Sequence, residues 1–283
     1  MPSGSPRPPR RTAVALLAAL CVGSLLVLAL ALRQARSAAD GAPSPPAADG
    51  RRAAPPAGPG AARRVAHLGA AYDVRVVDVR RAELRFFWRD GRGRPFGSIG
   101  ALRAHVERGG RTLLFATNAG MYRPDQTPVG LYVEEGRELV PLDARRGLPG
   151  NFYLPDNGVF FLGEHGAGIV ESSAYPPRGA GAVRYATQSG PLLVRGGSVN
   201  PLFGAGSRNL RIRSGVGLVT ADSVVFAISR EPVSFHAFAT LFRDVLGCRD
   251  ALFLDGEISL MYLPELSRRD AGGTFGAIVA LTD

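Results

Sequence analysis

Small polar residues follow several of the short apolar segments in this sequence, and chemistry is expected at those points. Four such junctions carry Asn118, Gln188 with Ser189, Arg213 with Ser214, and Asp255 with Gly256, Glu257 and Ser259. A strand that ends in polar residues and glycine lets the backbone approach a ligand and directs side chains into a shared cleft. Each junction taken alone is equally typical of an ordinary turn, but four together favour a binding site.

Asp255 is the leading candidate for a catalytic group. It directly follows an apolar run, so we expect its carboxylate to be partly desolvated and its pKa to be tuned by that burial. The structural alternative is a turn in which Asp255 bonds backbone amides ahead of Gly256. Glycoside hydrolysis commonly uses two carboxylates, one as acid and one as nucleophile or base. The sequence alone does not decide whether Glu257, Asp125 or Asp156 is the second.

An arginine cluster precedes the third junction. Arg208, Arg211 and Arg213 lie close together around Asn209. Arginine binds phosphate through two parallel hydrogen bonds, so the cluster fits a phosphodiester substrate. A solvated basic loop is the alternative, because arginine supplies all of the cationic side chains in this chain.

The charge distribution argues against a nucleic-acid partner. The net charge is +10, but residues 1–64 carry nine Arg against two Asp, whereas residues 65–283 carry 25 Arg against 22 acidic residues. A nucleic-acid-binding domain needs a basic face on its folded part. The folded part here is close to balanced, so we predict no nucleic-acid partner.

The first 64 residues have the composition of a leader and a tether. Residues 1–11 form a basic flank, residues 12–32 an apolar run long enough to span a bilayer, and residues 33–64 a linker rich in Ala, Pro, Gly and Arg. We expect a single-pass anchor with residues 65–283 on the extracytoplasmic side. Small residues near position 38 keep secretion after cleavage open as the alternative.

Cysteine and histidine usage gives no metal signature. Cys21 lies in the apolar run and Cys248 follows an expected helix, which argues against a disulfide framework and a thiolate zinc site. The four histidines show no ligand spacing. No cofactor is predicted, and metal involvement is undecided, since Asp and Asn oxygens suit a hard divalent cation but nothing demands one.

The expected elements are many short strands and two helices. Residues 72–79 and 83–88 read as paired strands, and residues 98–108 as a helix. Hairpins are expected within residues 129–142, 158–171 and 215–229, and the second helix follows Ser234 and ends at Gly247. The predicted fold class is α+β: a single domain with a largely antiparallel or mixed sheet, built of hairpins, with the two main helices packed on it.

Six motifs in order resemble the phosphodiester glycosidase family, on the side of its bacterial branch, which is often linked to exopolysaccharide. They are TNAGMY at residues 117–122, PVGL at 128–131, GNF at 150–152 with NGVF at 157–160, QSGP at 188–191, RSGVG at 213–217 and LDGEIS at 254–259. They span nearly all of residues 70–282. The lysosomal branch has a glycine-rich stretch where this chain has Glu257 and Ile258, and two glycines where it has Ala119 and Gly120.

The resemblance implies a hydrolase that splits a sugar-1-phosphodiester at the glycosidic bond of a carbohydrate or sugar-phosphate substrate. On that basis Asp255 and Asn118 are the expected catalytic residues. The expected substrate-binding residues are Gln188, Ser189, Arg213, Arg208, Asn157, Gly256, Glu257 and Ser259. The alternative reading is a non-catalytic domain that binds a cell-surface glycan or phospho-glycan in the same cleft.

Overall fold

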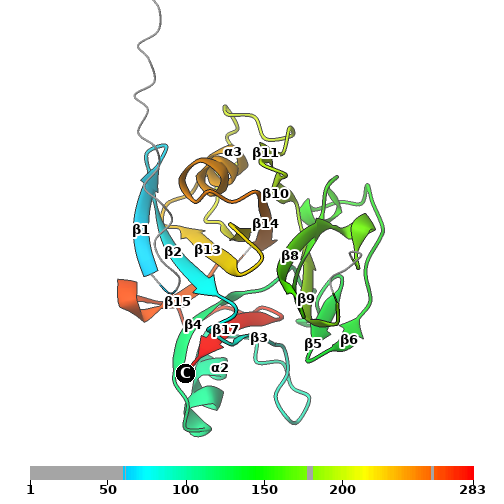
Figure 1. Ribbon diagram of the computed structural model, residues 1–283, viewed down its shortest axis with the longest axis vertical. Helices are drawn as coiled ribbons and strands as arrows, with labels where there is room; N and C mark the ends of the chain where they lie inside the picture. Colours follow the sequence, from blue (N-terminus) through cyan, green and yellow to red (C-terminus); the bar gives the residue numbers. More distant parts are fainter. Residues whose placement is uncertain (1–59, 61, 177–180, 256–257) are drawn as a thin grey trace, which may run out of the picture. The chain divides into compact units, whose positions relative to one another are not determined.

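The computed structural model describes residue 60 and residues 62–176, 181–255 and 258–283, all within the unit Ala53–Asp283. The described residues form three β-sheets, and every strand pairing among them is antiparallel (Figure 1). The expected membrane segment, residues 12–32, lies outside this part of the chain. None of the helices in the described part is long and apolar enough to cross a membrane.

The first sheet has seven strands. Their order is β1 (Ala62–His67), β2 (Ala70–Asp78), β13 (Ser223–Ser229), β12 (Ser214–Leu218), β14 (Asp250–Asp255), β10 (Leu192–Arg195) and β11 (Ser198–Val199). The predicted hairpin within residues 215–229 is confirmed as β12 and β13. β1 begins at Ala62, inside the range that composition assigns to the linker.

The other two sheets have five strands each. The second sheet runs β16 (Arg268–Arg269), β15 (Met261–Leu263), β4 (Leu113–Asn118), β17 (Ile278–Thr282) and β3 (Leu84–Phe87). The third runs β6 (Arg137–Val140), β5 (Tyr132–Glu134), β9 (Val183–Ser189), β7 (Gly158–Gly163) and β8 (Gly166–Glu171). The expected hairpins β5–β6 and β7–β8 are confirmed.

The prediction that residues 72–79 and 83–88 pair with each other is wrong. β2 pairs with β1 and β13 in the first sheet, whereas β3 pairs with β17 in the second. The chain therefore crosses from one sheet to another within the short turn between β2 and β3. The neighbour along the chain that does pair with β2 is β1, which precedes it.

Side chains from all three sheets meet in one central core. Phe226 of β13 contacts Phe115 of β4 and Phe160 of β7, with ring centroids 5.1 Å and 6.0 Å apart. All three rings are fully buried. Burial of each such side chain contributes roughly 1.5–3 kcal/mol to folding. Because the core joins the sheets, it fixes the ends of their strands relative to one another.

Helix α2 (Ile99–Arg108) confirms the first expected helix. The Ser98 hydroxyl caps it by accepting a hydrogen bond from the Ala101 amide at 3.2 Å. Its buried face, made by Ile99, Leu102 and Val106, packs on the second sheet. Gly109 follows the last helical residue, as the sequence predicts.

The second expected helix is shorter than predicted. Helix α3 (Phe235–Thr240) is capped by Ser234 and then changes to π-helical spacing over Leu241–Val245. The change follows Thr240, whose hydroxyl donates to the carbonyl of His236 at 2.8 Å and so competes with the regular helix bonds. We call residues 235–245, the α-helical and π-helical parts together, the α3 segment. It packs closely on β12, where a Cβ on Gly217 would lie 2.6 Å from the side chain of Phe242.

The predicted fold class is therefore wrong in its architecture. The described residues are mostly β-sheet, distributed over three sheets, and α2 is the one full-length α-helix among them. The α3 segment covers one face of the first sheet and α2 covers the second sheet (Figure 1).

Candidate functional site

Asp255 ends β14 at an irregular point in the first sheet. Ser214 of β12 pairs with Asp255, but the next residue, Gly215, pairs with Phe253. Leu254 is therefore an extra residue on β14, which is the definition of a β-bulge. Such bulges bend the strand and re-aim its side chains, and they are frequent beside active sites.

Because of the bulge, Asp255 lies on the face of the first sheet that points to the central core, and not on the face covered by α3. Regular alternation would group Asp255 with Ala251 and Phe253, which pack under α3. Pairing with Ser214 instead groups it with Val216, which faces the central core. Asp255 is 4% exposed. The carboxylate is thus buried at the end of the core, where the sheets meet.

Ser189, at the end of β9, supports this bulge from the third sheet. Its hydroxyl donates a hydrogen bond of 2.6 Å to the carbonyl of Leu254, the extra residue. Ser189 is fully buried. The sequence predicts that Ser189 binds substrate, and the structure places its hydroxyl on the backbone that positions Asp255.

Asn118 brings the second sheet to the same place. Its side-chain oxygen accepts hydrogen bonds of 3.1 Å from the Ser214 hydroxyl and 3.1 Å from the Leu260 amide. The Asn118 amide nitrogen donates to the carbonyl of Ala119 at 3.3 Å. Asn118 is 1% exposed, so this network fixes the orientation of its side chain.

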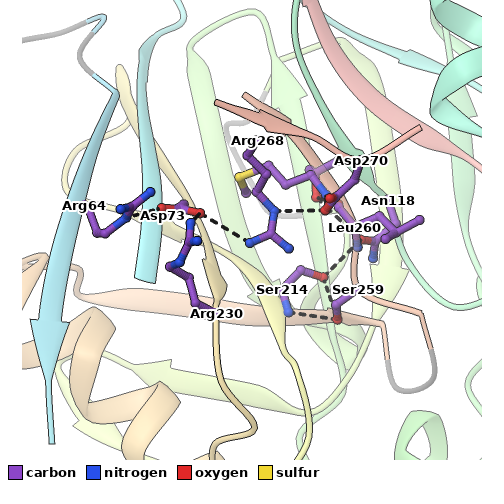
Figure 2. A network of polar contacts seen from close by, with 11 residues as sticks. Arg64, Asp73, Asn118, Ser214, Arg230, Ser259, Leu260, Arg268 and Asp270 are labelled. Atoms are coloured by element: carbon purple, nitrogen blue, oxygen red, sulfur yellow. Dashed lines mark hydrogen bonds and ion pairs between the residues drawn. The ribbon is translucent and has the colours of Figure 1, made fainter. Parts of the chain in front are cut away.

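Ser259 closes the network between the two sheets. Its hydroxyl oxygen accepts from the Ser214 amide at 3.0 Å and shares a 3.2 Å hydrogen bond with the Ser214 hydroxyl. Figure 2 shows Asn118, Ser214, Ser259 and Leu260 joined in one cluster. The structure therefore brings together Asn118, Ser259 and, through its strand pairing with Ser214, Asp255. We call Asn118, Ser214, Ser259 and Asp255 the candidate site.

Ser214 is the member of this cluster to which sequence reasoning assigned no role. It lies at the first position of β12 and makes contacts to both Asn118 and Ser259. In the sequence, Ser214 could have been found from its place between Arg213 and Gly215 at the start of an expected strand. At that place a role was predicted for Arg213 and none for Ser214.

Gly120 explains the small residues that follow Asn118. The Gly120 amide donates to the Thr187 hydroxyl at 3.1 Å. A Cβ at Gly120 would lie 2.2 Å from the carbonyl oxygen of Gln188. A residue with a side chain cannot be placed there unless β9 moves away. The glycine thus allows the end of β4 to approach the end of β9.

Gln188 spends its hydrogen-bonding capacity inside the protein. Its side-chain oxygen accepts from the amides of Leu131 and Asp143, both at 2.9 Å. Its nitrogen donates to the Asp143 carbonyl at 2.8 Å and to Asn157 and Ser172 at 3.1 Å each. The structure thus places Gln188 and Asn157, both predicted to bind substrate, in a network that holds the loop around Asp143.

We expect Gln188→Leu to lower stability rather than substrate affinity. The substitution leaves the buried amide of Leu131 and the part-buried amide and carbonyl of Asp143 without their partner, which costs about 3 kcal/mol. Urea unfolding checks this, with Ser173→Ala, at a nearby exposed hydroxyl, as the control expected to change little. If Gln188 instead contacts substrate, the folded variant will show a raised KM at nearly unchanged stability.

Arg213 lies on the helix side of the first sheet. Its guanidinium lies 3.6 Å from the ring centroid of Phe235 and donates to the carbonyls of Val233 and Asn209, both at 2.9 Å. Burial, with a smaller contribution from Arg211, lowers the pKa of Arg213 to about 10. Arg208 is exposed. The structure therefore groups neither arginine with Asn118, Ser214 and Ser259.

Two of the predicted residues, Gly256 and Glu257, lie outside the described residues. Among those that are described, no group of three or more His, Cys, Asp or Glu side chains could hold a metal ion. A hollow of about 590 Å³ lies near the start of β9, at the opposite end of that strand from Ser189. It is lined in part by Glu83, Arg184 and Asp222. None of the predicted site residues lines it.

A second polar cluster, which the sequence reading missed, lies along the same row of the first sheet. Asp73 of β2 has a fully buried side chain and forms ion pairs with Arg64, Arg230 and Arg268 at 3.0 Å, 3.0 Å and 3.3 Å. Desolvation raises the pKa of Asp73, but hydrogen bonds from Arg64 and Arg268 and the charge of Arg230 outweigh it, so the pKa is lowered. We call these four residues the Asp73 cluster.

The Asp73 cluster connects to the candidate site through Arg268. The Arg268 Nε donates to Asp270 at 2.9 Å, and Asp270 accepts from the Met261 amide at 3.1 Å. Met261 directly follows Leu260, whose amide bonds Asn118. Figure 2 shows Arg268 between Asp73 and Asp270, with the Asn118–Ser214 contact beside it.

Comparison with known proteins places these features in a family. The model of the phosphodiester glycosidase family matches residues 111–272, which is more than half of the chain. The uncharacterized protein YigE of Escherichia coli strain K12 is 32% identical over 188 residues, covering 66% of this chain and 72% of that protein.

A solved structure shares the fold. The catalytic domain of zebrafish N-acetylglucosamine-1-phosphodiester alpha-N-acetylglucosaminidase, auto-inhibited by its pro-peptide, matches with a TM-score of 0.53 and 12% identity. The match covers 78% of this chain and 81% of that chain. All four residues of the candidate site lie within the region that the family model matches. The chain belongs to the phosphodiester glycosidase family.

Proposed function

We propose that this protein hydrolyses a sugar-1-phosphodiester at its glycosidic bond, releasing a free sugar and a phosphomonoester. Family membership supports the reaction class. The observation that carries the proposal is the placement of Asp255 by a β-bulge opposite Ser214, which is bonded to Asn118 and Ser259. A buried carboxylate beside a rigid polar cluster, where two sheets meet, suits the recognition of a sugar.

The leaving group makes one carboxylate sufficient for much of this chemistry. The bond between the anomeric carbon and the phosphate oxygen breaks, and water supplies a hydroxyl to carbon and a proton to solvent. The released phosphomonoester has a second pKa of about 6, so it is a good leaving group. It does not need to be protonated by an acid as it departs, as an alcohol does. Asp255 then acts as the nucleophile, or as the base that activates water.

The three uncharged residues of the candidate site, Asn118, Ser214 and Ser259, would hold the sugar and stabilise the charge that develops on it. Ser214, Ser259 and Asn118 already bond one another, so they lose little freedom when substrate arrives. Hydroxyl and amide groups of this kind bond sugar hydroxyls from both sides as donor and acceptor. Rigid placement of these groups is what makes charge stabilisation effective in a transition state.

The leader motivates the choice of substrate. An apolar run at residues 12–32, followed by a flexible tether, fits a domain that is held on, or released from, the outer face of the membrane. We propose that the substrate belongs to an exported or cell-envelope glycan. The anchor and this location are expectations from the sequence.

The test is turnover by the full-length chain on a panel of sugar-1-phosphodiesters in water enriched in ¹⁸O. We expect both free sugar and phosphomonoester, with the label on the sugar, because the glycosidic bond is the one that breaks. Label on the phosphate would contradict the proposal, since it identifies cleavage at phosphorus. Binding of the panel without turnover would favour the glycan-binding alternative.

A further inference from the structure

The row of paired residues across the first sheet places the Asp73 cluster beside the candidate site. Arg64 pairs with Asp73, Asp73 and Ser214 both pair with Ile228, and Ser214 pairs with Asp255. Paired residues share a face of the sheet, and neighbouring strands lie about 4.8 Å apart. Asp73 is therefore two strands, or roughly 10 Å, from Ser214 on the same face.

We propose that Arg230 and Arg268, held in place by Asp73, form the subsite that binds the phosphate group of the substrate. The inference rests on the proposed function and deepens it by assigning the anionic half of the ligand to residues outside the candidate site. Asp255 and its neighbours then contact the sugar, and the two arginines contact the phosphate.

Arg268 has donors left over after its internal contacts. Its Nη1 bonds Asp73 and its Nε bonds Asp270. Among the described residues, no hydrogen bond or ion pair joins its Nη2 to another group. The side chain as a whole is 15% exposed. A donor that is fixed at two other atoms and reaches solvent is well placed to bind an anion.

Arg230 offers a second guanidinium on the same carboxylate. Its Nη1 bonds Asp73 at 3.0 Å, and its side chain is 39% exposed. Arg64 completes the trio, but it stands on β1, the outermost strand, on the far side of Asp73 from Ser214. Figure 2 shows this order, with Arg64 farthest from Asn118 and Arg268 nearest.

The local charge also favours an anion. Three guanidinium groups share two carboxylates, those of Asp73 and Asp270. One positive charge of this group is therefore not neutralised within it. Glu231, next to Arg230, keeps its own charge and accepts a hydrogen bond of 2.8 Å from the Ala71 amide, in an exposed position. Arginine pairs, with several N–H donors each, match the geometry of a phosphate group.

The test is the binding of inorganic phosphate to the full-length chain, measured by calorimetry at constant ionic strength. We expect Arg268→Gln and Arg230→Gln each to weaken phosphate binding about tenfold, because each loses hydrogen bonds to a charged group. Arg64→Gln and Arg92→Gln should stay within about threefold of the original protein, since neither faces the ligand. Arg92→Gln removes the same charge from an exposed turn.

The outcomes separate this inference from the proposed function. Phosphate binding is measured without substrate, so it does not depend on turnover. If the original protein binds no phosphate, or if Arg92→Gln weakens binding as much as Arg268→Gln, the inference is overturned even when turnover is seen. Should Arg268→Gln fail to fold, Arg230→Gln decides the matter, because that side chain is more exposed and its loss is better tolerated.

Discussion

Replacing Asp255 with Asn should reduce kcat/KM about a thousandfold on any sugar-1-phosphodiester that the protein hydrolyses. The amide has the shape of the carboxylate, but it can neither attack the anomeric carbon nor take a proton from water. Asp255 is 4% exposed and ends β14 at the bulge, so a residue of the same size keeps the strand pairing. Steady-state kinetics with thermal unfolding of both proteins check this.

The matched control is Asp222→Asn. Asp222 lies in the turn between β12 and β13, is 37% exposed, and pairs with Arg80 at 2.7 Å. We expect this variant to keep full activity. A loss of activity in Asp255→Asn that is explained by unfolding would assign Asp255 a structural role. A change in ligand affinity with no turnover in either protein would identify the domain as a glycan-binding module.

Elements specified by neighbouring residues were predictable from the sequence. Helix α2 has its cap at Ser98, its apolar face and Gly109 within a dozen residues, so the signals lie inside the element. The hairpins β5–β6, β7–β8 and β12–β13 join strands across short turns, and their pairing is again local.

The architecture was not predictable because it depends on contacts between distant residues. β2 lies between β1 and β13, a strand about 150 residues later in the chain, and the next strand along the chain, β3, joins another sheet. The sequence shows an apolar run for each of these strands but not its neighbours. The α3 segment shows the converse, since its apolar residues predict a long helix and the bond from Thr240 shifts its spacing.

The candidate site was predictable in its positions but not in its side-chain directions. Asn118 and Ser259 were expected from their places after apolar segments, and they do meet. Gln188 follows a strand in the same way and is as buried as Asn118, yet its side chain bonds the loop around Asp143 and not this cluster. A polar residue at a strand end looks the same in sequence whichever hydrogen-bond network it joins.

The alternation of side chains in β12 explains why Ser214 was missed. Arg213 and Ser214 are adjacent, so they point to opposite faces of the sheet. The arginine, with the stronger chemical signal, packs against Phe235, and the serine points to Asn118. The Asp73 cluster was missed because its three arginines come from β1, from the residue after β13 and from β16, which only the fold brings together.

Replacing Asp73 with Asn should lower the free energy of unfolding by about 3 kcal/mol at neutral pH. The substitution leaves the three guanidinium groups of the Asp73 cluster facing one another without their shared carboxylate. Arg64 and Arg230 are partly exposed and keep some hydration, which places the estimate at the low end for a broken buried pair. Arg268, at 15% exposure, bears most of the loss.

The pH dependence of this difference follows from the pKa of Asp73. That pKa is lower in the folded protein than the ordinary value of 3.8, so the ionised carboxylate favours folding at every pH above that value. As pH falls through the lowered pKa, the carboxylate takes up a proton and the stabilisation disappears. Urea unfolding of the original protein and of Asp73→Asn should therefore differ most at pH 7, and the difference should be smaller at about pH 3, below the ordinary pKa of 3.8. Asp222→Asn is the control expected to show little difference at pH 7, because Asp222 is 37% exposed and its ion-pair partner Arg80 is 75% exposed. A difference for Asp73→Asn that is the same at both pH values would show that the carboxylate charge does not hold the arginines in place.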